Sequence, residues 1–369
     1  MKFTCEKSFL LTAVTTASRA AAPKSPIPAL EGLLINANVS VRITGYNLKE
    51  GIYADLEADV QKPGAVIINA RLLSEIVRSL PDGTVKLYTD ENNMTKITCG
   101  NTNFLISGTD AADYPEMPPV NLNGTVSLKQ GTLKNMINQT IFAISENESR
   151  PIYTGSLFEV SDGYLTVVSV DGFRLAMRKE KLDSPAQDGV FIVPGNALSD
   201  LEKICLNTDD PIKIAPSEKN ISFIAENTVL ISRRLEGEFL NYKKSIPTDF
   251  NISVYVDVTE FTRVIDRVSL ITDDRMKTPM KFVFGKDEIF INCETALGRA
   301  EDIYHSEGDG KNLEIGFNNR YVSDALKAAP ADRAVLKLNT GSSPCVLTPE
   351  DENDSFLYMI LPVRLKTGD

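Results

Sequence analysis

Few residues of this chain belong to the types that carry acid–base or nucleophilic chemistry. The 369 residues include one histidine, His305, in an acidic stretch from Glu301 to Gly310 that we expect to be a solvated loop. Five cysteines lie far apart with no C-x-x-C pair, which is typical of free buried thiols in a reducing compartment. The sequence holds no phosphate-binding G-x-x-x-x-G-K-S/T loop, no G-x-G-x-x-G after a strand, no EF-hand pattern and no H-E-x-x-H. We therefore expect no catalytic, cofactor-binding or metal-binding residues.

The elements that would have to position a site recur three times along the chain. Each copy begins with a helix-like stretch and a proline-marked loop, continues through a strand, a turn and a strand, and then runs from a further strand into a second helix. Apolar residues recur at helical spacing in the first helices: Leu10, Val14, Ala17 and Ala21; Leu133, Ile137, Ile141 and Ile144; Phe261, Val264, Ile265 and Val268. The second helices share a Ser-acid pair: Ser74-Glu75, Ser199-Asp200 and Ser323-Asp324.

A repeat of this length is the size of a domain. The expected hairpin turns lie near Asn38, at Asp162-Gly163 and at Gly285-Lys286-Asp287. We interpret the chain as three consecutive α+β domains of one fold, each with two helices on one face of antiparallel strands. The predicted domains are residues 1–122, 123–247 and 248–369. The alternative is one large mixed domain in which the similarity is accidental.

The net charge of −11 taken alone argues against a nucleic-acid partner. The three predicted domains have net charges of −2, −2 and −7, and much of the acid lies in turns and loops. The predicted helices and their exits are richer in base. If these helices shared one surface, it could hold phosphates without reading sequence. The expected DNA-facing residues are Arg19, Lys24, Arg71, Arg78, Lys134, Arg150, Lys203, Arg263 and Arg267. An ordinary polar helix face is the alternative.

Seven segments in this order resemble the beta subunit of bacterial DNA polymerase III, the processivity clamp. They are MKFTCEKSFLL, SRAAAPKSPIPALEGLL, GTDAADYPEMP, TVVSVDGFRLA, EGEFLNYKKSIP, EIGFNNRYVSDAL and YMILPVRL. The resemblance covers essentially the whole chain. It implies a non-catalytic sliding clamp, a head-to-tail homodimer whose six domains form a ring around duplex DNA, with helices lining the hole. It also implies that Phe104 and Ile106 of one protomer meet Leu270 and Ile271 of the other, an apolar contact suited to an interface.

The resemblance further implies a groove that binds short peptides of the replicative polymerase, the clamp loader and repair proteins. The positions that match the family's groove are Tyr153, Val170, Gly172, Phe173, Arg174, Leu175, Leu240, Lys244, Met276, Asn318, Tyr321, Pro344, Met359, Ile360, Leu361, Pro362, Val363, Arg364 and Leu365. Apolar side chains would form its walls, Met359 would repack around varied partners, and Arg174 and Arg364 would supply hydrogen bonds at the rim. Leu240 stands where many members have proline, and Ser245 where an apolar residue is common. Gly195-Asn196 replaces an often basic pair.

Two other function classes fit parts of the sequence. One is an enzyme with its site in an interdomain cleft, which the scarcity of histidine and the missing phosphate loops disfavour. The other is an acidic scaffold that binds proteins and never DNA. No apolar run approaches the ~20 residues needed to span a bilayer, and the N-terminus lacks the apolar core of a signal peptide, so we expect a cytoplasmic protein without a membrane partner.

Overall fold

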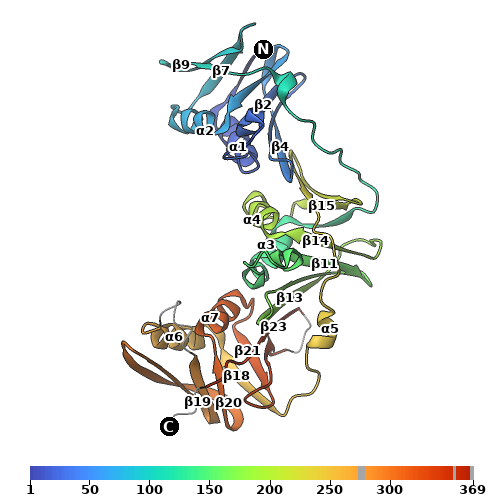
Figure 1. Ribbon diagram of the computed structural model, residues 1–369. Helices are drawn as coiled ribbons and strands as arrows, with labels where there is room; N and C mark the ends of the chain where they lie inside the picture. Colours follow the sequence, from blue (N-terminus) through green and yellow to red (C-terminus); the bar gives the residue numbers. More distant parts are fainter. Residues whose placement is uncertain (273–278, 352–354, 366–369) are drawn as a thin grey trace. The chain divides into compact units, whose positions relative to one another are not determined.

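The computed structural model describes residues 1–272, 279–351 and 355–365, in which short helices alternate with antiparallel strands (Figure 1). Contacts divide the chain into two compact units, each assembled from separate stretches of sequence. Unit 1 comprises Met1–Lys134, Asp183–Gln187 and Asn196–Arg234. Unit 2 comprises Asn135–Leu182, Asp188–Gly195 and Leu235–Asp369.

Unit 1 holds two antiparallel sheets, with strand orders β5-β1-β7-β8-β9 and β10-β15-β16-β17-β4-β3-β2-β6. Its strands are β1 (Lys2–Glu6), β2 (Gly32–Ala37), β3 (Val41–Tyr46), β4 (Glu50–Leu56), β5 (Asp59–Lys62), β6 (Gly64–Asn69), β7 (Thr84–Thr89), β8 (Met94–Cys99), β9 (Thr102–Ser107), β10 (Val126–Lys129), β15 (Pro211–Pro216), β16 (Asn220–Ala225) and β17 (Thr228–Arg233). Its helices are α1 (Lys7–Ser18), α2 (Ala70–Ser79), the 3-10 turns η1 (Pro28–Glu31) and η2 (Ala111–Asp113), and most of α4 (Gly195–Ile204). The larger sheet joins β4 to β17, strands far apart in sequence.

Unit 2 is built around a ten-stranded sheet with the order β14-β11-β12-β13-β23-β22-β21-β18-β20-β19. The strands are β11 (Gly155–Ser161), β12 (Tyr164–Val170), β13 (Arg174–Lys181), β14 (Gly189–Pro194), β18 (Ile252–Asp257), β19 (Met280–Thr295), β20 (Gly298–Phe317), β21 (Arg333–Leu338), β22 (Cys345–Pro349) and β23 (Phe356–Ile360). The helices are α5 (Tyr242–Ser245), α6 (Val258–Ser269), α7 (Asn319–Ala328), and the turns η3 (Ile141–Ala143) and η4 (Pro151–Thr154); α3 (Gln130–Asn138) begins in unit 1 and ends here.

Side-chain periodicity explains why these segments form these elements. In α6, all four residues of the expected apolar stripe are buried, and the Asp257 carboxylate caps the helix by accepting the Glu260 N–H at 2.7 Å. β7 alternates strictly between exposed and buried residues, as a strand with one solvated face does. The helices α1 and α2 pack together in unit 1, and α6 and α7 pack together in unit 2 (Figure 1). The predicted α+β class, with repeated helix pairs on antiparallel strands, is confirmed.

Three local expectations were wrong. The turn predicted at Gly285-Lys286-Asp287 is an irregularity inside the single long strand β19, whose partner β20 continues past it with shifted register. The stretch Glu301–Gly310 is part of β20 and no loop, although His305 is solvent-exposed as expected. Two first helices end early, so Ala21 follows α1 and Ile141 and Ile144 follow α3. In the part of the chain that the structure describes, no helix has the length and apolar character to cross a membrane.

Candidate functional site

Three neighbouring strands of unit 2 bring together the apolar residues expected in a groove. The β12–β13 hairpin pairs Val170 with Leu175, and β13 pairs Leu175 with Met359 of β23. These three side chains are 3%, 1% and 7% exposed, and they belong to one apolar cluster that Tyr153 joins from η4. The Tyr153 ring meets the Phe239 ring edge-to-face at 5.5 Å between centroids. The structure therefore assembles an apolar wall from four expected positions that are far apart in sequence.

Arg174 is fixed inside the site and is not a free hydrogen-bond donor at its rim, which corrects the sequence expectation. Its side chain is only 7% exposed. Its Nε donates to Asp171 Oδ2 at 2.9 Å and its Nη1 to Asp324 Oδ2 at 2.6 Å. Its guanidinium also lies 4.5 Å from the centre of the Tyr321 ring. Two carboxylates and an aromatic face satisfy this cation, so burial without a peptide is tolerable.

The hairpin turn before Arg174 presents an aromatic ring to solvent. Asp171 accepts the backbone N–H groups of Phe173 at 2.8 Å and Arg174 at 3.0 Å, and Gly172 takes a left-handed φ of 94° that side chains rarely adopt. Phe173 is 60% exposed and stacks on Tyr321 with 6.3 Å between centroids. An exposed ring held this firmly can contact a ligand at little entropic cost.

The C-terminal segment is tied to this turn by backbone hydrogen bonds. The Leu361 N–H donates to the Phe173 carbonyl and the Val363 N–H to the Gly316 carbonyl, both at 2.8 Å. Residues 362–365 line a hollow of about 360 Å³ together with Gly316, Gly341 and Ser342. A Cβ at Gly316 would approach the Val363 carbonyl oxygen to 2.6 Å, so this close approach requires glycine. Arg364 is exposed and Leu365 half-buried.

The remaining expected groove residues are less uniform. Asn318 caps α7, its side-chain oxygen accepting the Arg320 N–H at 3.0 Å, so it has a structural role whatever else it contacts. Leu240 is 41% exposed and Lys244 is exposed, whereas Pro344 is half-buried and Ile360 is buried. Met276 lies outside the described residues. Sequence reasoning missed the carboxylates of Asp171 and Asp324; the recurrent Ser-acid pair at Ser323-Asp324 was their one signal.

The nine cationic residues expected to face DNA divide into two groups. Four have carboxylate partners: Arg19 with Asp200 at 3.4 Å, Arg71 with Glu75 at 2.9 Å, Lys134 with Glu202 at 3.8 Å and Arg267 with Asp302 at 2.7 Å. Pairs of this kind contribute little to stability, and the partner lowers the net positive charge offered to a phosphate. The others are solvent-exposed: Lys24, Arg78, Arg150, Lys203 and Arg263.

The four expected interface residues differ in exposure. Leu270, directly after α6, is 83% exposed, far more than a large apolar residue usually is in a finished surface. Phe104 and Ile106 on β9 and Ile271 are half-buried against the cores beside them. Between Phe104 and Ile106, Leu105 points to the other face of its sheet and is 66% exposed.

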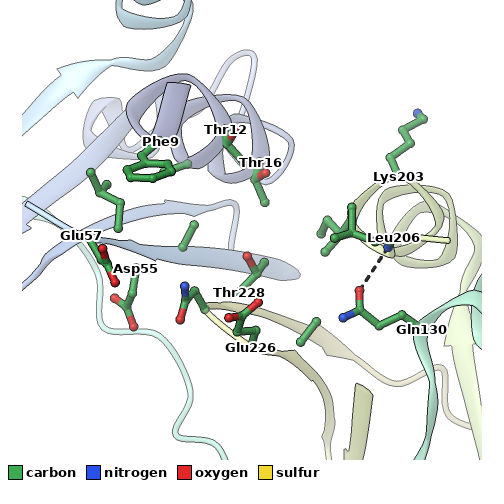
Figure 2. A pocket seen from close by; sticks show the side chains of 16 residues that line it. Phe9, Thr12, Thr16, Asp55, Glu57, Gln130, Lys203, Leu206, Glu226 and Thr228 are labelled. Atoms are coloured by element: carbon green, nitrogen blue, oxygen red, sulfur yellow. Dashed lines mark hydrogen bonds between the residues drawn. The ribbon is translucent and has the colours of Figure 1, made fainter. Parts of the chain in front are cut away.

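A separate hollow of about 460 Å³ lies within unit 1 (Figure 2). It is lined by α1, the end of β4, the β16–β17 turn and the end of α4. Phe9 is 49% and Leu206 58% exposed there, and the Gln130 side-chain oxygen accepts the Leu206 N–H at 3.1 Å. Acidic side chains of Asp55, Glu57 and Glu226 lie on its other side (Figure 2). Lys203 is the one expected DNA-facing residue on its wall.

Burial makes the thiols of this protein unreactive. All five cysteines are buried and free, and desolvation raises the pKa of Cys5, Cys205 and Cys345 to about 12. Thiolates, the reactive form, are therefore scarce at neutral pH. Among residues 1–272, 279–351 and 355–365, no group of three or more His, Cys, Asp or Glu side chains could hold a metal ion.

Repeated α+β domains whose sheets continue from one repeat into the next, with an apolar groove on unit 2, define a multidomain binding protein. Family models of the DNA polymerase III beta subunit match the chain throughout: its N-terminal domain at residues 1–118, its central domain at 127–241 and its C-terminal domain at 243–364. The chain belongs to this family, the beta sliding clamps, which are processivity factors and not enzymes.

Individual relatives agree along their full length. The beta sliding clamp of Staphylococcus epidermidis is 31% identical, and the match covers 99% of each chain. The solved DNA polymerase sliding clamp from Bacillus subtilis is 29% identical, with a TM-score of 0.95 over 99% of each chain. The beta subunit from DNA polymerase of Streptococcus pyogenes is 26% identical, with a TM-score of 0.92 over 99% of this chain and 100% of that one.

Proposed function

We propose that two copies of this chain close head to tail into a ring around duplex DNA and tether the replicative polymerase through the groove of unit 2. The observation that carries the ring is a strand junction that occurs twice within the chain. In unit 1, β4 pairs antiparallel with β17, and in unit 2, β13 pairs antiparallel with β23. In both cases the third strand of one repeat joins the last strand of the next repeat.

Equivalent hairpin turns fix the correspondence between the repeats. Asn47 accepts the N–H groups of Lys49 and Glu50, just as Asp171 accepts those of Phe173 and Arg174. In the third repeat, Thr295 Oγ1 accepts the Leu297 N–H at 3.1 Å. These turns make Glu50, Arg174 and Gly298 equivalent, and each stands where the junction strand of its repeat begins.

The third junction lacks a partner within the chain. Over Gly298–Ile303, β20 pairs on one side with β19, and β9 pairs on one side with β8, as far as the described residues go. Both edges offer unpaired backbone groups that favour addition of another strand. The register of the β4–β17 junction, transferred to these edges, pairs the β20 edge of one protomer with β9 of the other as Gly298 with Ile106, Arg299 with Leu105 and Ala300 with Phe104.

Side-chain packing supports the same contact. At the β13–β23 junction, the Phe142 ring meets the Tyr358 ring edge-to-face at 5.4 Å. Leu270 follows the first residue of α6 at the same interval as Phe142 follows that of α3, and Phe104 is the equivalent of Tyr358 in the strand pairing. The exposed Leu270 of one protomer would therefore cover Phe104 of the other, with Ile106 and Ile271 beside them.

In this assembly, DNA is retained by topology and only weakly by charge. The net charge of −11 opposes general adhesion to DNA, and several expected phosphate contacts already have carboxylate partners. Strong phosphate contacts would slow a sliding ring. The apolar wall of Val170, Leu175 and Met359, with the exposed Phe173 ring, suits apolar anchors of a short peptide from the polymerase, the clamp loader or repair proteins.

The domain assignment 1–122, 123–247 and 248–369 is part of this proposal. Each family-model match lies inside one of these ranges, which supports the boundaries. Because the template is chromosomal DNA of a bacterial type of replication machinery, we also place the protein in the cytoplasm.

Loading onto circular DNA tests the ring. The protein is loaded by a clamp loader onto a nicked circle, washed in high salt, and the circle is then cut. We expect retention on the intact circle and rapid loss from the cut one, because salt screens phosphate contacts and leaves a topological link intact. Equal retention on both DNAs would refute the topological mechanism.

A further inference from the structure

Unit 1 contains an apolar cluster that is the counterpart of the groove in unit 2. The hairpin pair Tyr46–Gly51 corresponds to Val170–Leu175, and the cross-strand pair Leu34–Ile67 corresponds to Leu157–Ile192. Leu30 in η1 corresponds to Tyr153 in η4, since both turns begin with proline and end just before a strand that starts with glycine. The unit 1 cluster consists of buried Ala29, Leu30, Tyr46, Ile67 and Tyr114, with Ala22, Leu34 and Met117 packed on it.

A segment of the chain itself occupies this counterpart. Tyr114 is 8% exposed and its hydroxyl donates to the Thr44 carbonyl at 3.2 Å. Met117 reaches further in: a Cβ at Gly51 would lie 2.3 Å from the Met117 Cε and 3.0 Å from its Sδ. Gly51 stands where unit 2 has Leu175, so the Met117 thioether fills the space that a side chain at position 51 would take. Backbone bonds between Thr109 and Ile67, at 2.9 and 3.1 Å, hold the start of the segment.

The corresponding segment of unit 2 ends differently. Tyr242 is buried in the groove cluster and its hydroxyl donates to Glu159. Three residues later, where the first segment has Met117 after Tyr114, this one has Ser245, whose hydroxyl bonds to the Asn241 carbonyl of its own turn. A serine side chain is too short to enter an apolar groove and loses little by staying in its turn. In unit 2, the floor of the groove is made by Leu175 and nothing equivalent to Met117 covers it.

We propose that unit 1 holds a second groove for an apolar linear peptide, occupied in cis by Tyr114–Met117 with Met117 as the anchor. The proposal rests on the proposed function of the unit 2 groove, whose architecture it shares. A tethered segment is present at an effective concentration in the mM range, so it competes strongly with free peptides of moderate affinity. Each protomer then presents one open groove, although its fold builds two.

The test is peptide stoichiometry with Met117→Ser, which gives the first segment the residue of the second. The probe is a short synthetic peptide with leucine and phenylalanine anchors and a photoreactive group, with cross-linked residues mapped by mass spectrometry. We expect the wild type to be labelled in unit 2 alone. M117S should be labelled in both units, with labelling near Leu30 and Tyr46 rising about tenfold or more as the tethered competitor is removed. Met94→Ser, at a half-buried methionine outside the cluster, is the matched control and should behave as the wild type.

The outcomes separate the two proposals. Labelling of unit 2 alone in a folded M117S overturns the second groove and leaves the proposed function standing. Labelling of neither unit overturns both, and labelling of unit 1 alone in M117S overturns the groove of unit 2. If M117S fails to fold, Gly51→Ala decides, because its Cβ displaces the tip of Met117 while keeping the apolar side chain in the segment. Absence of unit 1 labelling in a folded G51A then counts against the proposal.

Discussion

Glu50 is a carboxylic acid in a place where negative charge is costly. Its side chain is 7% exposed and its Oε1 has no hydrogen-bond partner among the described residues. Burial raises the pKa of Glu50 from 4.5 to about 8, and the charge of Asp200 adds to the shift. Its equivalent in the next repeat is Arg174, which is neutralised by two carboxylates. One fold thus solves the same position with a protonated acid and with a paired cation.

Glu50→Gln is expected to stabilise unit 1 in mild alkali. Because the folded-state pKa lies above the unfolded one, the stabilising effect of the protonated acid is complete below about pH 4.5 and is lost as pH rises through 8. The neutral amide should raise the free energy of unfolding on the order of 2 kcal/mol near pH 8.5, with a smaller effect near pH 5. Urea unfolding at the two pH values measures this, with exposed Glu57→Gln as control. An E50Q effect independent of pH would mean that Glu50 is ionised in the folded protein.

Leu175 and Met359 should determine peptide affinity. Truncating a buried anchor at the centre of an interface costs about 1–4 kcal/mol of binding, so Leu175→Ala or Met359→Ala should weaken a clamp-binding peptide roughly tenfold or more while the dimer persists. Calorimetric titration measures the affinity. Leu347→Ala is the control, since Leu347 is 2% exposed in the neighbouring strand but belongs to a different core cluster. Equal peptide affinity in L175A and L347A would contradict the groove.

At the scale of single residues, the sequence predicted which side chains matter better than what they do. The resemblance placed Val170, Leu175 and Met359 in one site, and the structure brings them together. It also suggested that Arg174 acts at the rim. That role failed because the second carboxylate partner, Asp324, lies on a helix that contacts Arg174 only after folding. A lone sequence gives no measure of such long-range pairing.

At the scale of elements, local periodicity was sufficient for helices and insufficient for one long strand pair. The stripe of α6 could be read from sequence because helical neighbours are three and four residues apart. The pairing of β19 with β20 could not, because Asp287, with a positive φ of 58°, has the chemistry of a turn. Its partner strand continues past the irregularity, and only that tertiary pairing makes the segment a strand.

The free edges of β9 and β20 should control assembly, and Leu270 is the most accessible test. A carboxylate buried without a partner in an apolar contact costs several kcal/mol, so Leu270→Asp should weaken the dimer about a hundredfold or more. Sedimentation over a protein dilution series measures the change. Val39→Asp is the control, since Val39 is 97% exposed on the β2–β3 turn, away from both edges. A dimer equally stable in L270D would rule out this contact.

At the scale of the whole molecule, strand and helix surfaces carry different chemistry. In unit 1, exposed residues of five neighbouring strands form the row Lys62, Lys2, Tyr88, Lys96 and Leu105, with Lys86 beside it. A chain with net charge −11 therefore has basic residues on its sheets as well as on its helices. The repeat pattern indicated that the helices share a role, but composition could not say which lysines and arginines meet DNA.

Two matched sets of substitutions separate electrostatic attraction from topological retention. The helix set is Lys24, Arg71, Arg150 and Arg263 to Ala; the strand set is Lys2, Lys62, Lys86 and Lys96 to Ala. Each removes four positive charges, so the change in net charge is the same. If helix-borne cations contact phosphate, the helix set should weaken binding to short linear duplex about tenfold or more and flatten its salt dependence, while the strand set changes neither. Fluorescence anisotropy at several salt concentrations measures this.

Retention on a closed circle should not follow these affinities. A ring that has been loaded leaves by opening or by reaching an end, and neither step depends on weak phosphate contacts. Both sets should therefore remain on nicked circular DNA at high salt for as long as the wild type, with the helix set impaired only in the loading step. If instead the helix set is lost from intact circles as fast as from cut ones, charge and not closure holds the protein on DNA.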